Sequence, residues 1–198
     1  MELIKKRRSI RVFTGKKIPE KDIKKIIEAG IWAPSGCNNQ ELRFLILEDM
    51  EEIKKFKPHL QGVSHFILIF ADMSLPGSKM YKNKHERNLP YVDTGLALQN
   101  MVLYAKSIGI DSCICNLSEY HFIITGSITK KILNRIRVFF KMRKNSFEYV
   151  LRNKLKVPEH LEIMCSVALG YGKIEPDINT VMHGGKKIMR KNVGEHIL

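Results

Sequence analysis

Apolar residues recur along the chain with two periods, and each period predicts a different kind of element. In residues 20–31 isoleucines stand three and four positions apart, as on one face of a helix. Pro19 suits the first turn of such a helix, and the acidic residues Glu20 and Asp22 suit its positive end. We therefore expect an amphipathic helix here, with its apolar face against a sheet.

Short apolar runs predict the strands of that sheet. They lie at residues 43–47, 65–70, 110–117 and 161–169. The run at 65–70 is apolar after its first residue, which is typical of a strand buried on both faces. A short charged helix is expected between the first two strands, at residues 50–56.

The longest helical pattern covers residues 89–108 and ends at Gly109, a common stop signal. Residues 72–88, just before it, contain a charged run and are expected to form a surface connection. The apolar positions of the long helix include three that share one stripe: Val92, Leu96 and Leu103.

Length and charge set wide limits on what the chain is. With 198 residues and 44% hydrophobic content it can bury one substantial core, so residues 1–198 are predicted to form a single domain. Lys and Arg number 34 against 20 for Asp and Glu, a net charge of +14. Such a charge favours anionic partners, which include phosphate-bearing cofactors, nucleic acid and acidic membrane surfaces.

The sequence gives no sign of export, membrane insertion or metal binding. The N-terminal residues lack the apolar core of a signal peptide, and no apolar run approaches the roughly 18 residues of a membrane span. The four cysteines have no C-x-x-C spacing, which favours reduced thiols, and no metal site is expected. The sequence therefore predicts a soluble cytoplasmic protein.

Residues 33–40 combine chain breakers with small polar groups directly after the first predicted helix. Pro34 pushes the residue before it out of helical geometry, and Gly36 lets the main chain approach a ligand closely. A capped turn between a helix and a strand would use the same residue types. A ligand-binding loop is the other interpretation, because four side chains add uncharged donors and acceptors that suit a ring edge or a polyol: Ser35, Asn38, Asn39 and Gln40.

Three arginines and a serine stand together near the N-terminus, at Arg7, Arg8, Ser9 and Arg11. A guanidinium presents a planar fork of donors that matches two phosphate oxygens at once, so this cluster suits a phosphate group. A solvated basic chain end explains the cluster equally well when it is considered by itself.

The order and spacing of these two motifs resemble those of the flavin-dependent nitroreductase family. There an Arg-Arg-Ser-x-Arg start leads through a helix to a Trp-Ala-Pro-Ser-x-x-Asn-x-Gln loop, and the counterparts here are residues 7–11 and 32–40. The resemblance covers roughly residues 5–117 and 158–195. It implies an α+β fold in which helices surround a central mixed β-sheet, and a homodimer with much of its interface on the helix at 89–108. An extended C-terminal arm would cross to the partner.

The resemblance also implies FMN as the cofactor, bound by groups from both ends of the chain. Its phosphate would be held by Arg7, Ser9 and Arg190. Arg8 would lie at the edge of the flavin, and Arg11 would lie near N1, where positive charge stabilises the reduced ring.

Two further segments would contact the flavin in this family. Pro34, Ser35 and Asn38, together with Gln40, would reach the flavin of the other subunit. A backbone N–H directed at the flavin N5 would come from Asn116 or Leu117, where relatives often have glycines. A second departure is Asn192, which replaces a proline usual after the C-terminal arginine.

The activity implied is that of an oxidoreductase. FMN would take a hydride from NADH or NADPH and then reduce a small organic acceptor, such as a nitroaromatic, a quinone or an activated alkene, in a ping-pong reaction. Because the cofactor carries this chemistry, no catalytic side chain is predicted. The absence of nucleophile-elbow, phosphate-loop and H-E-x-x-H motifs agrees with this expectation.

Residues 118–157 depart from the family pattern and form a basic insert. One or two basic amphipathic helices are expected at 130–156. Three interpretations stay open for them, namely a lid over the flavin, an electrostatic site for an acidic substrate, nucleic acid or partner, and a helix on a membrane surface. The alternative function is therefore a basic nucleic-acid- or partner-binding protein with a non-catalytic flavin site.

Overall fold

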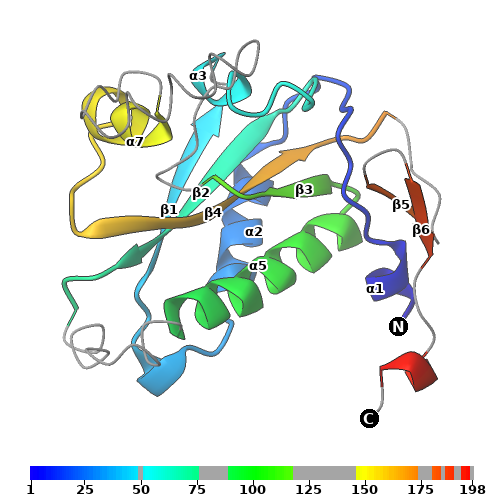
Figure 1. Ribbon diagram of the computed structural model, residues 1–198, viewed down its shortest axis with the longest axis horizontal. Helices are drawn as coiled ribbons and strands as arrows, with labels where there is room; N and C mark the ends of the chain where they lie inside the picture. Colours follow the sequence, from blue (N-terminus) through cyan, green and yellow to red (C-terminus); the bar gives the residue numbers. More distant parts are fainter. Residues whose placement is uncertain are drawn as a thin grey trace.

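A four-stranded antiparallel sheet forms the centre of the computed structural model (Figure 1). Its strands, in their order across the sheet, are β1 (Leu42–Glu48), β2 (His65–Asp72), β4 (Leu161–Gly170) and β3 (Asp111–Cys115). Each strand overlaps the apolar run that predicted it, and β1 and β3 are the two edges. The structure describes residues 1–48, 51–75, 89–117, 146–173, 180–183, 186–189 and 193–196.

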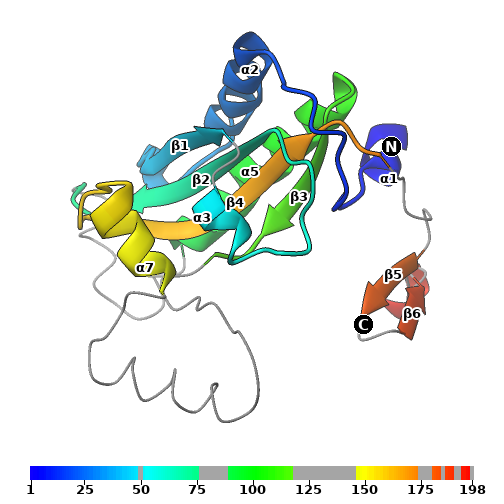
Figure 2. The ribbon, with the colours of Figure 1, turned by 90° about the horizontal axis from the view of Figure 1, so that it is seen from above.

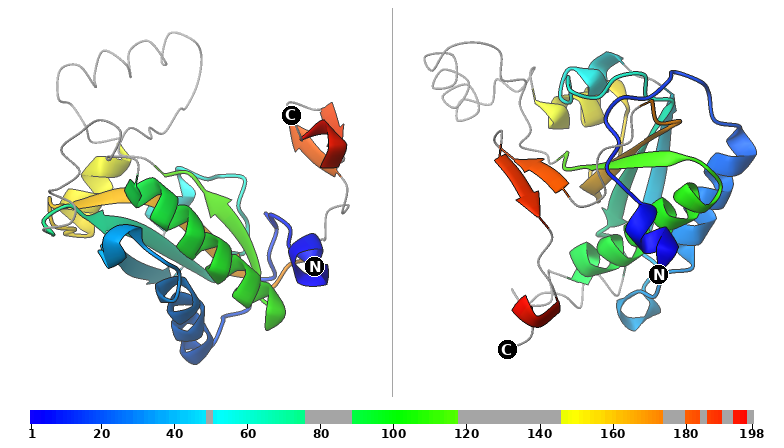
Figure 3. Two further views of the ribbon diagram at one scale, coloured as in Figure 1. Left: turned by 90° about the horizontal axis from the view of Figure 1, so that it is seen from below. Right: turned by 90° about the vertical axis from the view of Figure 1, so that its right-hand side faces the viewer.

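Helices cover both faces of this sheet (Figures 2 and 3). The helices α2 (Glu20–Ile31) and α5 (Leu89–Ser107) lie on one face. The short helices α3 (Glu51–Lys54) and α7 (Phe147–Tyr149), the latter continued by a π-helical turn at Val150–Lys154, lie on the other. Buried apolar side chains accordingly form two clusters, one on each face.

The prediction that β2 is buried on both faces is confirmed, since all eight of its residues are buried. Phe66, Leu68 and Phe70 belong to the cluster under α3 and α7, whereas Ile67 and Ile69 belong to the cluster under α2 and α5. Alternate side chains of a strand point to opposite faces, so a central strand between two helical layers has to be apolar at every position.

The helix predicted at 20–31 is also confirmed. Pro19 precedes it at the N-cap position, and its buried face carries Ile23 and Ile26. At Gly30, near the helix end, an added Cβ would lie 2.8 Å from the Cγ of Met101. The absence of a side chain at Gly30 therefore lets α2 pack closely against α5.

The long helix α5 is confirmed, and Gly109 follows it with a φ of +78°. The side chains that it buries include Leu98, Met101 and Ala105. Its predicted stripe faces the other way, because Val92 is 53% exposed and Leu96 is 42% exposed. Within one chain, α5 therefore carries an outward apolar stripe as well as a buried one.

The N-terminal segment follows helix α1 (Glu2–Lys6) and crosses the edge of the sheet. Ser9 forms a parallel bridge with Ser112 of β3, and the N–H of Ile10 donates to the carbonyl of Ser112 at 2.9 Å. The α+β class is confirmed. Parallel pairing enters the described part of the chain only through single bridges, so the expected mixed sheet is antiparallel in its four strands.

The basic insert is described only at its C-terminal end, residues 146–157, and residues 118–145 lie outside the described ranges. This end is helical, as expected, and it is part of the core. Phe147 and Leu151 are fully buried, and the ring of Phe147 meets that of Phe56 edge to face at 5.3 Å. These residues therefore anchor the insert to the core beside α3.

The C-terminal segment forms a two-stranded hairpin over part of the predicted extended arm. Strands β5 (Thr180–His183) and β6 (Lys186–Met189) pair antiparallel. The hairpin stands apart from the main sheet, and a 3₁₀ turn at Val193–Glu195 follows it (Figure 2). Among the described residues, no helix has the length and apolar character needed to cross a membrane.

Candidate functional site

The arginine segment predicted to bind phosphate lies along the edge strand β3. The Ser9–Ser112 bridge fixes it there, with Arg7 and Arg8 half-buried and Arg11 exposed. Arg8 donates to the carbonyl of Arg7 at 2.7 Å, and Arg11 donates to the carbonyl of Ser9 at 3.3 Å. These bonds keep the guanidinium groups close to the backbone of the segment.

The thiol of Cys113, on β3, shows that positive charges converge at this edge. Its pKa is lowered to about 7, first by a hydrogen bond with Cys115 and further by the charges of Arg11, Lys57 and Arg7. We call Arg7, Arg11 and Lys57 the cationic cluster. Lys57 was missed in the sequence because it is a single lysine some 50 residues from the arginines, and only the fold brings it to them.

The two residues predicted to present a backbone N–H to a flavin follow the same strand. Asn116 is exposed, and Leu117 is fully buried in the core. The cationic cluster and these two amides are therefore close neighbours along β3 and its C-terminal end. The side chain of Leu117 packs into the core, so it is not available to a ligand.

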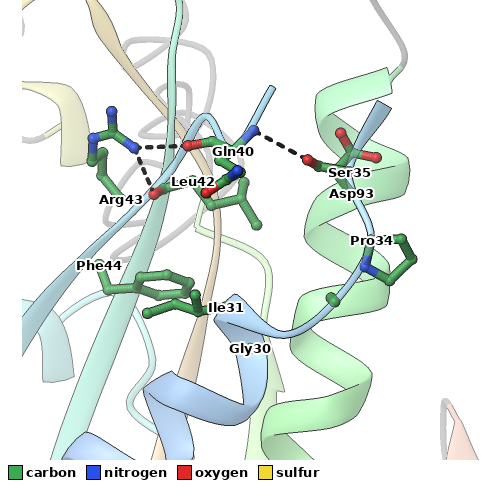
Figure 4. Close-up of a pocket in the computed structure, with 10 residues that line it drawn as sticks. Gly30, Ile31, Pro34, Ser35, Gln40, Leu42, Arg43, Phe44 and Asp93 are labelled. Atoms are coloured by element: carbon green, nitrogen blue, oxygen red, sulfur yellow. Dashed lines mark hydrogen bonds between the residues drawn. The ribbon is translucent and has the colours of Figure 1, made fainter. Parts of the chain in front are cut away.

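The predicted ligand loop lies at the other edge of the sheet, between the end of α2 and the start of β1 (Figure 4). The N–H of Gly36 donates to Oδ2 of Asp93 on α5 at 2.9 Å, and the N–H of Gln40 donates to Oγ of Ser35 at 3.1 Å. These two bonds tie the loop to α5 and close it on itself. Pro34, Asn38 and Gln40 are exposed along it.

The backbone of this loop is strained. Cys37 and Asn38 have a φ of +52° and Gln40 has a φ of +50°, in the left-handed region that non-glycine residues rarely adopt. Each such residue costs on the order of 1–3 kcal/mol, and strain of this kind clusters at ligand-binding sites. A plain connecting turn has no need of three such residues, so the geometry favours the ligand-loop interpretation.

A cavity of about 210 Å³ opens beneath the loop (Figure 4). Ile31 and Phe44 give it apolar walls, and Ser35, Gln40 and Asp93 give it polar ones. Pockets for drug-sized ligands usually enclose about 300–1,000 Å³, so this cavity has room for only part of such a ligand.

Two buried carboxyl groups support the loop, and sequence reasoning missed both. Glu41 is fully buried and Asp93 is 3% exposed. The pKa of Glu41 is raised, chiefly by burial and then by the carboxyl of Asp93. An acidic residue directly before a strand is ordinarily solvated, so nothing in the sequence distinguished Glu41.

The structure does not bring all predicted site residues together within one chain. Arg7, Arg11 and Asn116 lie at the β3 edge, whereas Ser35 and Gln40 lie beside β1, at the opposite edge of the sheet. Arg190, the third predicted phosphate ligand, lies outside the described residues.

These features define an α+β protein with a cationic site at one edge of its sheet and an uncharged, strained polar loop over a small cavity at the other. The chain belongs to the nitroreductase family, whose profile matches residues 4–65 and 64–171. The family expected from the two motifs is thereby confirmed.

Two archaeal relatives illustrate this membership. A protein of Archaeoglobus fulgidus, named as an NADH dehydrogenase/NAD(P)H nitroreductase, is 30% identical over 183 residues, covering 89% of this chain and 87% of the relative. A protein of Methanothermobacter thermautotrophicus with the same name is 29% identical over 185 residues, covering 89% of this chain and 78% of the relative.

Solved structures share the fold. A protein of Desulfovibrio desulfuricans, described as a nitroreductase and solved in complex with FMN, matches with a TM-score of 0.63 and 22% identity, covering 100% of this chain and 94% of that one. A protein of Clostridium acetobutylicum, described as an NADH oxidase, matches with the same TM-score and identity over 98% of this chain and 96% of that one. At 22% identity, these two matches show a shared fold and nothing beyond it.

Proposed function

We propose that this protein is an FMN-dependent oxidoreductase that takes a hydride from NADH or NADPH and reduces a small organic acceptor in a ping-pong reaction. The observation that carries the proposal is the cationic cluster along β3, because it offers a phosphate-binding chemistry close to the two residues whose amides we expect to meet the flavin ring. The FMN complex of the Desulfovibrio relative, which has the same fold, supports this cofactor.

The residues present fit FMN. Arg7 supplies a charged donor for the phosphate, and Lys57 adds a second positive charge, which suits a phosphate that is close to dianionic at neutral pH. Ser9 lies in the same segment and adds a hydroxyl donor. In this proposal Arg190 completes the phosphate site from the other end of the chain.

When bound, FMN supplies the ability to accept a hydride at its ring and to pass two electrons to a second substrate. The chain's own groups bind the flavin, orient it and stabilise its reduced form. Arg8 and Arg11 would place positive charge at the edge of the ring, which stabilises its anionic reduced form. The main-chain N–H of Asn116 or Leu117 would donate to the N5 position, and no side chain acts as a nucleophile or base.

We further propose that the active unit is a homodimer. The loop and the cationic cluster lie at opposite edges of one sheet, so the loop of one chain can close over the flavin of a second chain better than over its own. The outward stripe of α5, with Val92 and Leu96, offers an apolar surface for that second chain. A cavity of about 210 Å³ in one chain agrees with a site completed by two.

The domain organisation, the location and the acceptor expected from the sequence are also proposals. We propose a single domain over residues 1–198 and a cytoplasmic location. The acceptor would be a nitroaromatic, a quinone or an activated alkene.

Anaerobic reduction tests the function directly. The purified protein is expected to be yellow with one flavin per chain, to bleach when NADH or NADPH is added without oxygen, and to recover its colour when a quinone or nitroaromatic follows. A yellow protein that neither nicotinamide bleaches would contradict the reductase. A colourless protein held on nucleic acid in a salt-dependent way would favour the alternative basic binding protein.

A further inference from the structure

Glu41 is a buried acidic side chain whose position in the fold calls for an explanation. It lies between the strained loop and β1, with none of its surface exposed. Neither of its carboxyl oxygens has a hydrogen-bond partner among the residues that the structure describes. A carboxylate in such a place is costly unless it is paired, whereas a neutral carboxylic acid is tolerated far better.

A second carboxyl, that of Asp93, interacts with the carboxyl of Glu41. Asp93 is 3% exposed, and its Oδ2 already accepts the N–H of Gly36 from the loop. Two carboxyl groups in contact away from water do not both ionise readily, because like charges repel strongly at low dielectric constant. One proton between them would remove the repulsion and supply the missing hydrogen bond.

The other charged groups nearby do not neutralise Glu41. Arg43, two residues along on β1, pairs with Asp72 of β2 at 3.2 Å and donates to the carbonyls of Gln40 and Leu42. The main chain of Glu41 is fixed by the N–H of Asp72, which donates to its carbonyl at 2.9 Å. Asn39 also faces the carboxyl of Glu41, but it brings no charge.

We propose that Glu41 and Asp93 share one proton, and that this shared proton holds residues 35–40 in the shape that meets the flavin, which makes Glu41 a positioning residue. The assignment concerns the carboxyl pair itself, and its link to flavin rests on the proposed function. Removing the proton would place two negative charges directly under the loop. The Gly36–Asp93 bond that anchors the loop would then be lost or rearranged.

The expected pH dependence follows from the direction of the shift. The pKa of Glu41 is raised above its ordinary value, first by burial and then by Asp93. Its stabilising effect is therefore fully present below the unfolded-state pKa of about 4.5 and is lost as the pH rises through the folded-state pKa. Because one proton is involved, the folding equilibrium constant falls by at most about tenfold per pH unit in that range.

Urea unfolding of the flavin-free full chain at a series of pH values tests the shared proton. The variants are Glu41→Gln and Asp93→Asn, which keep the shapes and leave at most one ionisable group, and the control is Glu162→Gln, an exposed carboxylate on β4. Glu41→Gln is expected to lose the alkaline decline of the wild type, Asp93→Asn is expected to keep a smaller one because Glu41 stays buried, and the control is expected to keep it in full. If the free energy of unfolding changes with pH in the same way in the wild type and in Glu41→Gln, the proposal is wrong.

FMN titration across the same pH range tests the positioning role. The dissociation constant of the wild type is expected to rise with pH by up to about tenfold per unit, while that of Glu41→Gln stays flat and close to the wild-type value at low pH. If the unfolding experiments show the shared proton but neither the wild type nor any variant binds FMN, the proposed function is wrong. The proposal that Glu41 and Asp93 share a proton is then still supported. A wild-type FMN affinity that does not change with pH would overturn the positioning role. An affinity that increases with pH would overturn it too, because it would indicate that a bound cation, rather than a proton, neutralises the two carboxyl groups.

Discussion

At the scale of single residues, Gly62 controls how the arginine segment lies on the sheet. Its φ is +62°, and an added Cβ would lie 2.3 Å from the carbonyl oxygen of Phe13. The main chain on either side is paired with the N-terminal segment, since Gln61 donates to the carbonyl of Arg11 at 3.0 Å and Gly15 donates to that of Gly62 at 3.0 Å. The backbone after Arg11 therefore has no room to move away from a new side chain at Gly62.

We predict that Gly62→Ala destabilises the protein by roughly 2–5 kcal/mol, from the left-handed backbone and the clash together. Gly109→Ala is the matched control, because Gly109 also has a positive φ, +78°, but nothing lies within 4 Å of its added Cβ. The control should lose only about 1–2 kcal/mol. Urea unfolding measures the free energy of unfolding of both variants. Equal losses in the two would show that the backbone at Phe13 moves away from the new methyl group without an energetic penalty.

Asp111 joins three elements through one carboxylate. Its Oδ1 accepts a hydrogen bond from the ammonium group of Lys106 on α5 at 2.8 Å. Its Oδ2 accepts one from the N–H of Gly172, just beyond β4, at 2.9 Å. The side chains of Lys106 and Asp111 are 17% and 12% exposed, so the pair is largely screened from water. Removing the carboxylate would leave a nearly buried ammonium and a backbone N–H without these partners.

We predict that Asp111→Ala lowers the free energy of unfolding by about 2–4 kcal/mol. Glu51→Ala provides the contrast, since Glu51 pairs with Lys54 while its side chain is 81% exposed. Exposed pairs of that kind contribute about 0–1 kcal/mol. Thermal or urea unfolding measures both variants, and similar losses in the two would contradict a structural role for the Lys106–Asp111 pair.

At the scale of elements, α5 carries the outward apolar stripe that we propose as the dimer interface. Val92 and Leu96 stand on its outer stripe, and an added Cβ at Gly95 would meet nothing within 4 Å. A charge in the middle of this stripe would have to be desolvated on association, which weakens a dimer strongly.

We predict that Leu96→Glu raises the dimer dissociation constant by on the order of a hundredfold or more, equivalent to about 3 kcal/mol. Light scattering coupled to size exclusion measures the oligomeric state, and the same variant should lose flavin if two chains form the site. Lys21→Glu, on the exposed side of α2, is the control for added negative charge. A Leu96→Glu protein that stays dimeric and yellow would rule out this face as the interface.

The elements differ in how well the sequence predicted them. Residues 20–31 and 65–70 were predicted correctly because one face, or both, must be apolar to fit between a sheet and helices. The orientation of α5 was not predictable in the same way, since Val92 and Leu96 outside are as apolar as Leu98 and Met101 inside. Periodicity detects apolar faces, but it does not tell a core from an interface between chains.

The site divides along a similar line. Arg7, Arg11 and the loop at 33–40 could be proposed from the sequence because their residue types and spacing carry the chemistry in the sequence itself. Lys57 and Glu41 were not found, because their roles come from contacts that exist only after folding. The parts of the site that the sequence missed are those in which environment, rather than residue type, determines the behaviour of a side chain.

At the scale of the whole molecule, the net charge of +14 acts on any anionic ligand that approaches. Some of the basic groups are already engaged within the fold. Arg152, for example, donates to Glu148 and to the carbonyls of Val157 and Leu161, and Lys154 pairs with Glu52. The remaining field should still attract FMN through its phosphate, with the cationic cluster as the final point of contact.

We predict that the rate at which the flavin-free protein binds FMN falls by roughly tenfold between about 0.01 M and 0.1 M salt, where the Debye length shortens from about 30 Å to about 10 Å. Riboflavin, which lacks the phosphate, should bind with little salt dependence. Stopped-flow quenching of flavin fluorescence measures both binding rates.

Arg7→Gln is expected to weaken FMN binding by about ten- to a hundredfold, from one lost charged hydrogen bond, and to leave riboflavin binding unchanged. Lys21→Gln removes the same charge from a surface on α2 and serves as the control. FMN differs from riboflavin by its phosphate. Equal responses of FMN and riboflavin to salt and to Arg7→Gln would therefore show that the cationic cluster does not bind the phosphate.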